Sequence, residues 1–186
     1  MRYVHWMTCL VVLGLVLTAG CGGKEPIIET AAADMNLTAE EMGAGWTLMA
    51  EQGLEEMPTI REFPNVQDAN SRMFGNEESA GMLISMVLTT GSVASARQEM
   101  QGKSFQDMMG GMEEDLGIAM ADLTPPDVGD EALLMGGTEE ELSLNVYVCA
   151  FRKANVIAVF ALIGPTDAVD EGTVAQYAQA LEAKMH

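Results

Sequence analysis

ELSLNVYVCAFRKANVIAVFALI, residues 141–163, is the stretch of sequence that decides the predicted fold. Residues 141–153 alternate between two faces with the period of a β-strand. Residues 153–155 indicate a turn, and residues 156–163 are almost entirely apolar, as in a strand that is covered on both faces. The stretch therefore predicts an antiparallel hairpin within a sheet. One face of its first strand carries Leu142, Leu144, Val146, Val148 and Ala150.

Further strands and helices are predicted on the N-terminal and C-terminal sides of this hairpin. The other strand-like segments are residues 46–50, 81–90 and 131–135, the last closed by a turn at Gly136-Gly137. Helical signals follow Thr38, which forms a capping box with Glu41, and occupy residues 64–74, 93–116 and 167–185. This order predicts an α+β fold in which an antiparallel sheet of about five strands packs against helices.

An apolar segment near the N-terminus, residues 7–17, leads into Leu17-Thr18-Ala19-Gly20-Cys21. One positive charge precedes this segment and small residues follow it, which is typical of a secretory signal. It is shorter than the roughly 20 residues that cross a bilayer. Residues 17–21 resemble the lipobox of prokaryotic lipoproteins, although Thr18 stands where leucine is commonest. The resemblance implies cleavage between Gly20 and Cys21 and transfer of a diacylglyceryl group to the Cys21 thiol. The alternatives are an uncleaved anchor, or ordinary cleavage that leaves Cys21 as a free thiol.

The chain then divides into a signal peptide (1–20), a flexible linker (21–36) and a single acidic domain (37–186). It contains 28 Asp and Glu residues against 9 Lys and Arg residues, and its formal net charge of −19 becomes −20 when Arg2 leaves with the signal. Such a charge repels nucleic acids and anionic lipids, so it excludes nucleic-acid binding and assigns membrane attachment to the acyl chains. We expect a protein tethered to the extracytoplasmic face of the cell membrane.

Three short motifs occur in order along residues 40–186. They are Gly45-Trp46, the segment Gly129-Asp130-Glu131-Ala132, and the strand-turn-strand segment 151–156. In this order they resemble small exported lipoproteins and extracellular sensor domains with a PsbP-like α+β fold. The resemblance implies binding of a ligand or a protein partner rather than catalysis, and it assigns no binding residue.

Histidine, the commonest acid–base side chain in enzymes, is restricted to His5 in the predicted signal and His186 at the C-terminus. The domain therefore has no internal imidazole for Ser-His-Asp or Cys-His catalysis, or for a His-based zinc site. No P-loop, dinucleotide fingerprint or G-x-S-x-G motif occurs either. We expect no cofactor and no enzymatic activity. An enzyme that uses carboxylates alone is the third hypothesis, because acids are plentiful.

Methionine is unusually frequent, at 16 residues. Met108, Met109 and Met112 lie close together on a predicted helix, and thioethers are soft ligands that suit Cu(I). A Met-based, copper-binding envelope lipoprotein is therefore the alternative function. Packing in the core or against a partner explains the methionines more simply, because they are spread over most of the predicted elements and methionine fills irregular spaces.

Cys149 and a group of four acids are two further candidate sites. Cys149 could be a reactive thiol, but its place on an alternating strand favours a small core residue. Four acids flank the Pro125-Pro126 loop and could hold a hard cation, although a solvated loop is the simpler interpretation. They are Asp122, Asp127, Asp130 and Glu131. The sequence thus predicts a lipid-anchored, non-enzymatic domain that binds an unidentified protein or small molecule.

Overall fold

The computed structural model describes residues 25–186, apart from the side chains of residues 112–116. The strands are β1 (Trp46–Gly53), β2 (Val66–Asn76), β3 (Gly81–Thr90), β4 (Ala121–Leu123), β5 (Glu131–Glu139), β6 (Leu144–Lys153) and β7 (Val156–Pro165). The α-helices are α2 (Ala32–Met35), α3 (Ala39–Met42), α4 (Val93–Gln101), α5 (Lys103–Leu116) and α6 (Glu171–Glu182). Two short 3₁₀ helices, η1 (Leu54–Glu56) and η2 (Ile60–Glu62), connect β1 to β2.

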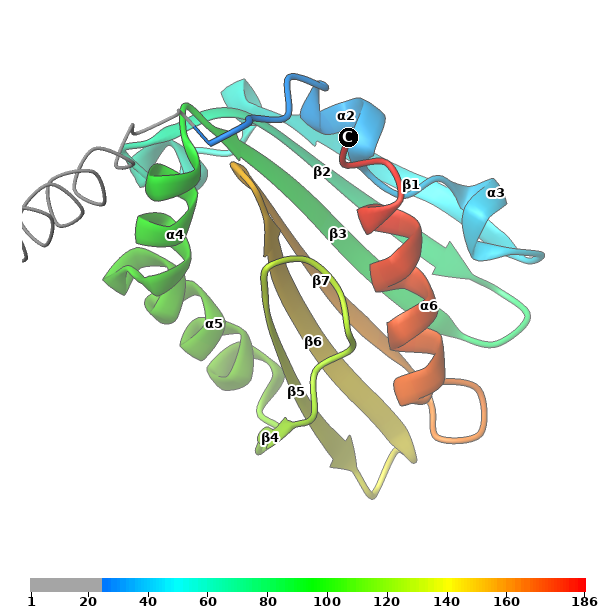
Figure 1. Ribbon diagram of the computed structural model, residues 1–186. Helices are drawn as coiled ribbons and strands as arrows, with labels where there is room; N and C mark the ends of the chain where they lie inside the picture. The colour runs from blue at the N-terminus through cyan, green and yellow to red at the C-terminus, as the bar shows by residue number, and fades with distance from the viewer. Residues whose placement is uncertain (1–24) are drawn as a thin grey trace, which may run out of the picture.

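Within the described residues, seven strands form one sheet in the order β1-β2-β3-β7-β6-β5-β4. Every neighbouring pair is antiparallel (Figure 1). This confirms the α+β class and the antiparallel sheet, whereas the expected number of about five strands was too low. The additional strands are β2 and β4.

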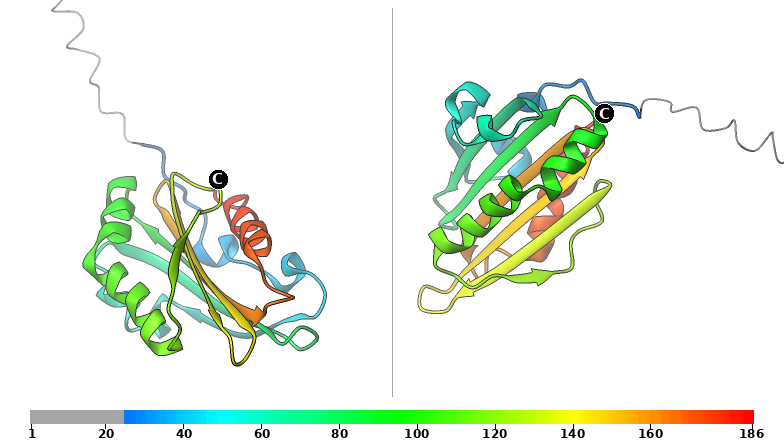
Figure 2. Two further views of the ribbon diagram at one scale, coloured as in Figure 1. Left: turned by 90° about the horizontal axis from the view of Figure 1, so that it is seen from below. Right: turned by 90° about the vertical axis from the view of Figure 1, so that its left-hand side faces the viewer.

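The predicted hairpin is β6 and β7, joined by a two-residue turn at Ala154 and Asn155. β7 lies in the middle of the sheet, between β3 and β6. Its residues from Val156 to Leu162 are buried on both faces, as the apolar run predicted. Helix α6 covers one face of the sheet, and α4 with α5 crosses the other (Figure 2).

Each face of the sheet carries its own apolar core. The α6 face packs large side chains of the sheet against the helix, including Phe74, Leu83, Phe151, Phe160 and Leu181. The α4–α5 face packs smaller strand residues against side chains of these helices, including Ala150, Ile157, Ala96, Met100 and Phe105. The sheet is therefore the middle layer of three, which is one of the few ways to bury both of its faces.

Strand β2 corrects the helix that we predicted over residues 64–74. The segment has few strand-forming residues, and Pro64 resembled a helix start. In the structure it pairs with β1 on one side and with β3 on the other, and it buries Ala69 and Phe74. Tertiary pairing between two strands has overridden a weak local preference, as it commonly does in sheets.

Strand β5 corrects the predicted turn at Gly136-Gly137. The strand runs through both glycines to Glu139, and the turn follows at residues 140–143. The two glycines instead allow the segment of residues 119–123 to lie very close to β5. A Cβ on Gly137 would lie 2.6 Å from the carbonyl oxygen of Ala119, and one on Gly136 would lie 2.6 Å from Leu123. Because neither glycine has a side chain, the segment that contains β4 can lie directly against β5.

The later part of the segment that we expected to be a flexible linker packs against the domain. Ala32 and Met35 of helix α2 are fully buried in the core on the α6 face. Upstream of them, the Ile28 amide donates to Asn155 Oδ1 at 2.6 Å. The sequence did not indicate this packing because the apolar residues between 25 and 36 are few and follow no clear period.

Candidate functional site

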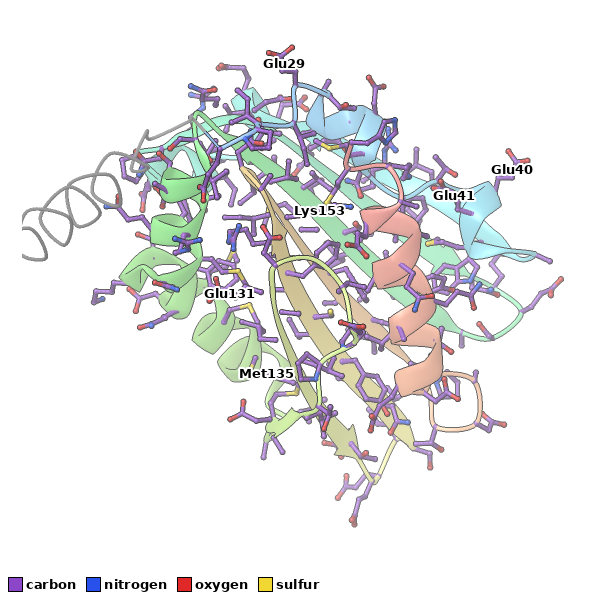
Figure 3. The ribbon with its side chains drawn as sticks, in the orientation of Figure 1. Glu29, Glu40, Glu41, Glu131, Met135 and Lys153 are labelled. Atoms are coloured by element: carbon purple, nitrogen blue, oxygen red, sulfur yellow. The ribbon has the colours of Figure 1, made fainter. Side chains whose placement is uncertain are left out.

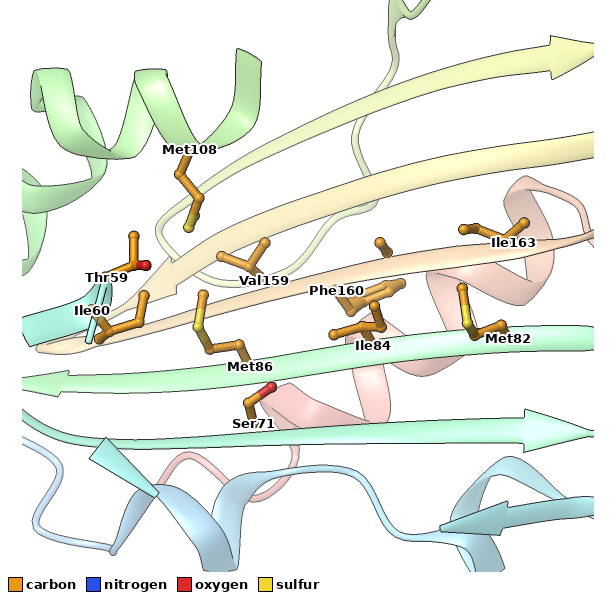
Figure 4. Close-up of a pocket in the computed structure, with 11 residues that line it drawn as sticks. Thr59, Ile60, Ser71, Met82, Ile84, Met86, Met108, Val159, Phe160 and Ile163 are labelled. Carbon is orange, nitrogen blue, oxygen red and sulfur yellow. The ribbon is translucent and has the colours of Figure 1, made fainter. Parts of the chain in front are cut away.

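The most apolar concave site is a cavity of about 380 Å³ on the α4–α5 face of the sheet, which we call the sheet-face groove (Figure 4). Its floor is formed by the middle strands, and its sides by α5 and by the segment around η2. The lining residues from β2, β3 and β7 are Ser71, Met82, Ile84, Met86, Val159, Phe160, Ala161 and Ile163. Thr59, Ile60 and Met108 complete the lining.

Strand β3 makes this groove apolar, because its side chains alternate between the two faces of the sheet. Gly81, Leu83 and Ser85 are buried on the α6 face. The intervening residues Met82, Ile84 and Met86 point to the opposite face and are only partly buried. Partial exposure of three apolar side chains in a row on an interior strand is unusual, because interior strands normally have both faces covered.

The groove is uncharged. Among the described residues that line it, the only side-chain polar groups are the hydroxyls of Thr59 and Ser71. Its volume lies within the range of small-molecule sites, which are mostly apolar with a few polar groups. A charged group would lose its hydration here without gaining a partner, so the groove favours an uncharged, apolar ligand.

Helix α5 separates the groove from a second cavity of about 440 Å³ on the same face of the sheet. Met108 lines the groove, whereas Phe105 and Met109 line the second cavity. Met135 of β5 lies on the far side of that cavity and is labelled in Figure 3. Helix α5 therefore lies across the sheet with a cavity on either side, of which only the groove is almost wholly apolar.

The predicted copper ligands do not share one cavity. Met108 is partly buried and faces the groove, while Met109 is buried against the second cavity. The side chain of Met112 lies outside the described residues. Among the described side chains, which exclude those of residues 112–116, no group of three or more His, Cys, Asp or Glu residues is placed to hold a metal ion.

Cys149 is a core residue, as its strand position predicted. It is fully buried and free of a disulfide. Burial raises the pKa of the Cys149 thiol to about 12, so the reactive thiolate is scarce at neutral pH.

The acidic loop around Pro125-Pro126 has a structural role at Asp130. This carboxylate accepts from Arg152 Nη1 at 2.7 Å and from the Ala154 amide at 2.9 Å, which fixes the β6–β7 turn. The Ala154 hydrogen bond is the main cause that holds the Asp130 pKa below its usual value. Asp122 lines the second cavity instead, so the structure separates these two acids.

The predicted lipidation site, Gly20 and Cys21, lies outside the described residues. No helix between residues 25 and 186 is long and apolar enough to span a membrane. The sequence pattern did not predict the groove. Residues 81–90 carried the signal that could have predicted it, because apolar residues occupy both faces of this predicted strand. The predicted helices were too few to cover both faces of the whole sheet.

The fold has a counterpart among solved structures. The extracellular domain of PknH from Mycobacterium tuberculosis aligns with 88% of this chain and 98% of its own length, at a TM-score of 0.61 and 11% identity. An uncharacterised protein from Mycobacterium smegmatis aligns with 77% of this chain and 90% of its own length, at a TM-score of 0.38 and 12% identity. No protein-family model and no curated protein matches the chain. The chain is thus an α+β domain that shares the fold of the PknH extracellular domain.

Proposed function

We propose that this protein is a lipid-anchored, non-enzymatic binding protein of the extracytoplasmic face, and that its sheet-face groove binds the acyl chain of a lipid. The observation that carries the proposal is the row of Met82, Ile84 and Met86, three apolar side chains left partly open on an interior strand. The signal-like segment before Cys21 and the fold shared with an extracellular domain support the location.

The shape of the groove favours an acyl chain over a compact apolar molecule. Met82 and Met86 are four residues apart on β3, which separates them by about 13 Å at the usual rise of a strand. Val159, Ala161 and Ile163 continue the apolar surface along β7. An extended hydrocarbon matches this long, narrow floor.

The methionines suit such a ligand. Their side chains are flexible and polarizable, so they adapt to chains that differ in length or unsaturation. The hydroxyls of Thr59 and Ser71 can bond an ester or hydroxyl at the polar end of the lipid. A protein tethered to a membrane would also find acyl chains close to it.

Acyl-chain binding in the groove is tested with the mature chain carrying Cys21→Ser, which removes the anchor but keeps residues 25–186. We expect saturable, one-to-one binding of a fluorescent monoacylglycerol. Met86→Gln should weaken binding by about tenfold or more, because the acyl chain would then bury an unpaired amide. Met135→Gln is the matched control, since Met135 lines the second cavity. Equal affinities for the two variants, or no saturable binding, would contradict the proposal.

The anchor is tested separately in cells. Cys21→Ser should abolish acyl labelling of the protein and release it from membranes, because each buried methylene of the acyl chains contributes about 0.8 kcal/mol to membrane attachment. Unchanged membrane retention of this variant would argue for an uncleaved anchor instead.

A further inference from the structure

A cavity of about 540 Å³ lies apart from the groove, where the N-terminal segment, α4 and the β6–β7 turn meet. It is lined by Glu25, Pro26, Val93, Arg97, Asp130, Arg152, Lys153 and Ala154. Figure 3 labels Lys153 at the end of strand β6 and Glu131 on the adjacent strand β5. Three of the chain's nine Lys and Arg residues line this one cavity. In a protein with a net charge near −20, such a concentration of cations needs a reason.

Arg97 is the first sign of an anionic ligand. Among the Lys and Arg residues between 25 and 186, it is the one with no ion pair or hydrogen bond to a described side chain or backbone group. The other six are all paired, as Arg61–Glu55, Arg72–Glu51, Lys103–Asp107, Arg152–Asp130, Lys153–Glu182 and Lys184–Glu41. Arg97 is exposed and lines the cavity, so its guanidinium is open to an incoming anion.

Arg152 is the second sign. Its side chain is 3% exposed, and Asp130 and the carbonyl oxygen of Ala154 hold its Nη1 atom at 2.7 and 3.0 Å. Its Nε atom is buried and lacks a hydrogen-bond partner, although Glu131 Oε2 lies 3.6 Å away. A buried donor left unpaired is costly, so a ligand oxygen that reached it would be favoured.

The acids next to the cavity are paired with Arg152 and Lys153, through Asp130, Glu131 and Glu182, and leave Arg97 without a carboxylate partner. Asp130 is already bonded to Arg152 and the Ala154 amide. Glu182 lies 3.5 Å from the Lys153 ammonium, on the α6 side of the turn. Glu25 is exposed at the cavity edge, on the N-terminal segment. Arg97 therefore remains free to form a charge-assisted bond with an incoming anion.

The position of the cavity indicates where the anion comes from. Glu25 is four residues after Cys21, so at most about 14 Å of extended chain separates the cavity edge from the predicted lipid anchor. If the anchor is in place, the cavity lies at the level of the lipid headgroups.

We propose that this cavity binds the phosphate of a membrane lipid headgroup, with Arg97 as its principal ligand and Arg152 and Lys153 beside it. The proposal rests on the proposed anchor at Cys21. Guanidinium groups form two parallel bonds to phosphate oxygens, which fixes orientation as well as position. The bound headgroup would hold the domain in one orientation on a membrane that its net charge otherwise repels.

The mature Cys21→Ser chain tests this without the anchor. Its binding is compared for phosphatidylcholine vesicles and for digalactosyldiacylglycerol vesicles, which are both neutral but differ in phosphate. We expect sedimentation with the first only, and shifts of the Lys153 and Ala154 amide signals. Arg97→Gln should weaken this binding by about tenfold or more, the effect of one charge-assisted hydrogen bond. Arg61→Gln, which makes the same charge change next to Glu55, should have no effect.

Three outcomes would overturn the assignment. Equal binding to both vesicles would exclude phosphate as the recognised group. Binding of inorganic phosphate that depends on Arg97, without binding to phosphatidylcholine vesicles, would assign the cavity to a free anion. Equal loss in the Arg97 and Arg61 variants would indicate a general charge effect. Loss of acyl labelling at Cys21 is measured separately, so a failure of the anchor cannot be mistaken for a failure of this site.

Discussion

At the scale of single residues, Gly129 and Arg152 hold the segment Gly129-Asp130-Glu131-Ala132 against strand β6. Gly129 has a φ of +65°, and a Cβ at this position would collide with the carbonyl oxygen of Arg152. The adjacent Asp130 amide donates to the same oxygen at 2.7 Å. Glycine at this position is therefore required both by the backbone angle and by the close approach of β6.

Gly129→Ala should consequently destabilise the protein by about 1–3 kcal/mol, through the strained angle and the collision. Gly110→Ala is the control, since a Cβ at this helical position would meet nothing within 4 Å. That change should raise stability by about 0.5–1 kcal/mol. Urea unfolding measures the change in unfolding free energy for both variants. The same sign for the two substitutions would contradict the described backbone at Gly129.

Asp130 makes the β6–β7 turn sensitive to acid. Because the folded-state pKa of Asp130 is lowered, its stabilisation is complete above its unfolded pKa and is lost as the pH falls through the folded value. Asp130→Asn keeps an oxygen for the Ala154 amide but removes the charge. The variant should be less stable than wild type at about pH 7 and close to it at about pH 2. A stability difference that stays constant between these pH values would rule out the charged pair with Arg152 as its cause.

At the scale of elements, prediction from sequence succeeded where a segment's period was clear. The hairpin of β6 and β7, strand β3 and the capping box at Thr38 all occur as predicted. Strand β2 was missed because its stability comes from two neighbouring strands. The groove was missed for a related reason: residues 82–86 show an apolar face, but only the positions of α5 and η2 reveal that it is incompletely covered.

The segment before residue 37 provides an element-scale prediction. Asn36 is fully buried and donates to Asn70 Oδ1 at 2.8 Å, while its own Oδ1 accepts from the Ser85 hydroxyl at 2.6 Å. Asn36→Ala would leave these partners unpaired and should cost about 2–4 kcal/mol of unfolding free energy. Glu29→Ala, on the exposed part of the same segment, should change it by about 0.5 kcal/mol or less. Equal small effects would mean that residues 25–36 behave as a flexible linker.

At the scale of the whole molecule, the two proposed sites suit a protein held near a membrane. The cation-lined cavity includes Glu25 and lies close to the predicted anchor, whereas the groove opens on the face of the sheet crossed by α5. The opposite face is closed by α6, whose Tyr177 packs edge-on against Trp46 at 6.3 Å between ring centroids. The headgroup site would orient the domain, and the groove would take an acyl chain.

The most direct test of the groove uses the methionines as separate reporters. Methyl-¹³C methionine NMR of the mature Cys21→Ser chain is recorded during titration with a monoacylglycerol. Met82, Met86 and Met108 line the groove, Met109 and Met135 line the second cavity, and Met35 and Met42 lie in the core under α6. We predict shifts of the first three signals and contacts between their methyl groups and the ligand's methylene protons. Shifts confined to the other methionines, or none at saturating ligand, would contradict acyl-chain binding in the groove.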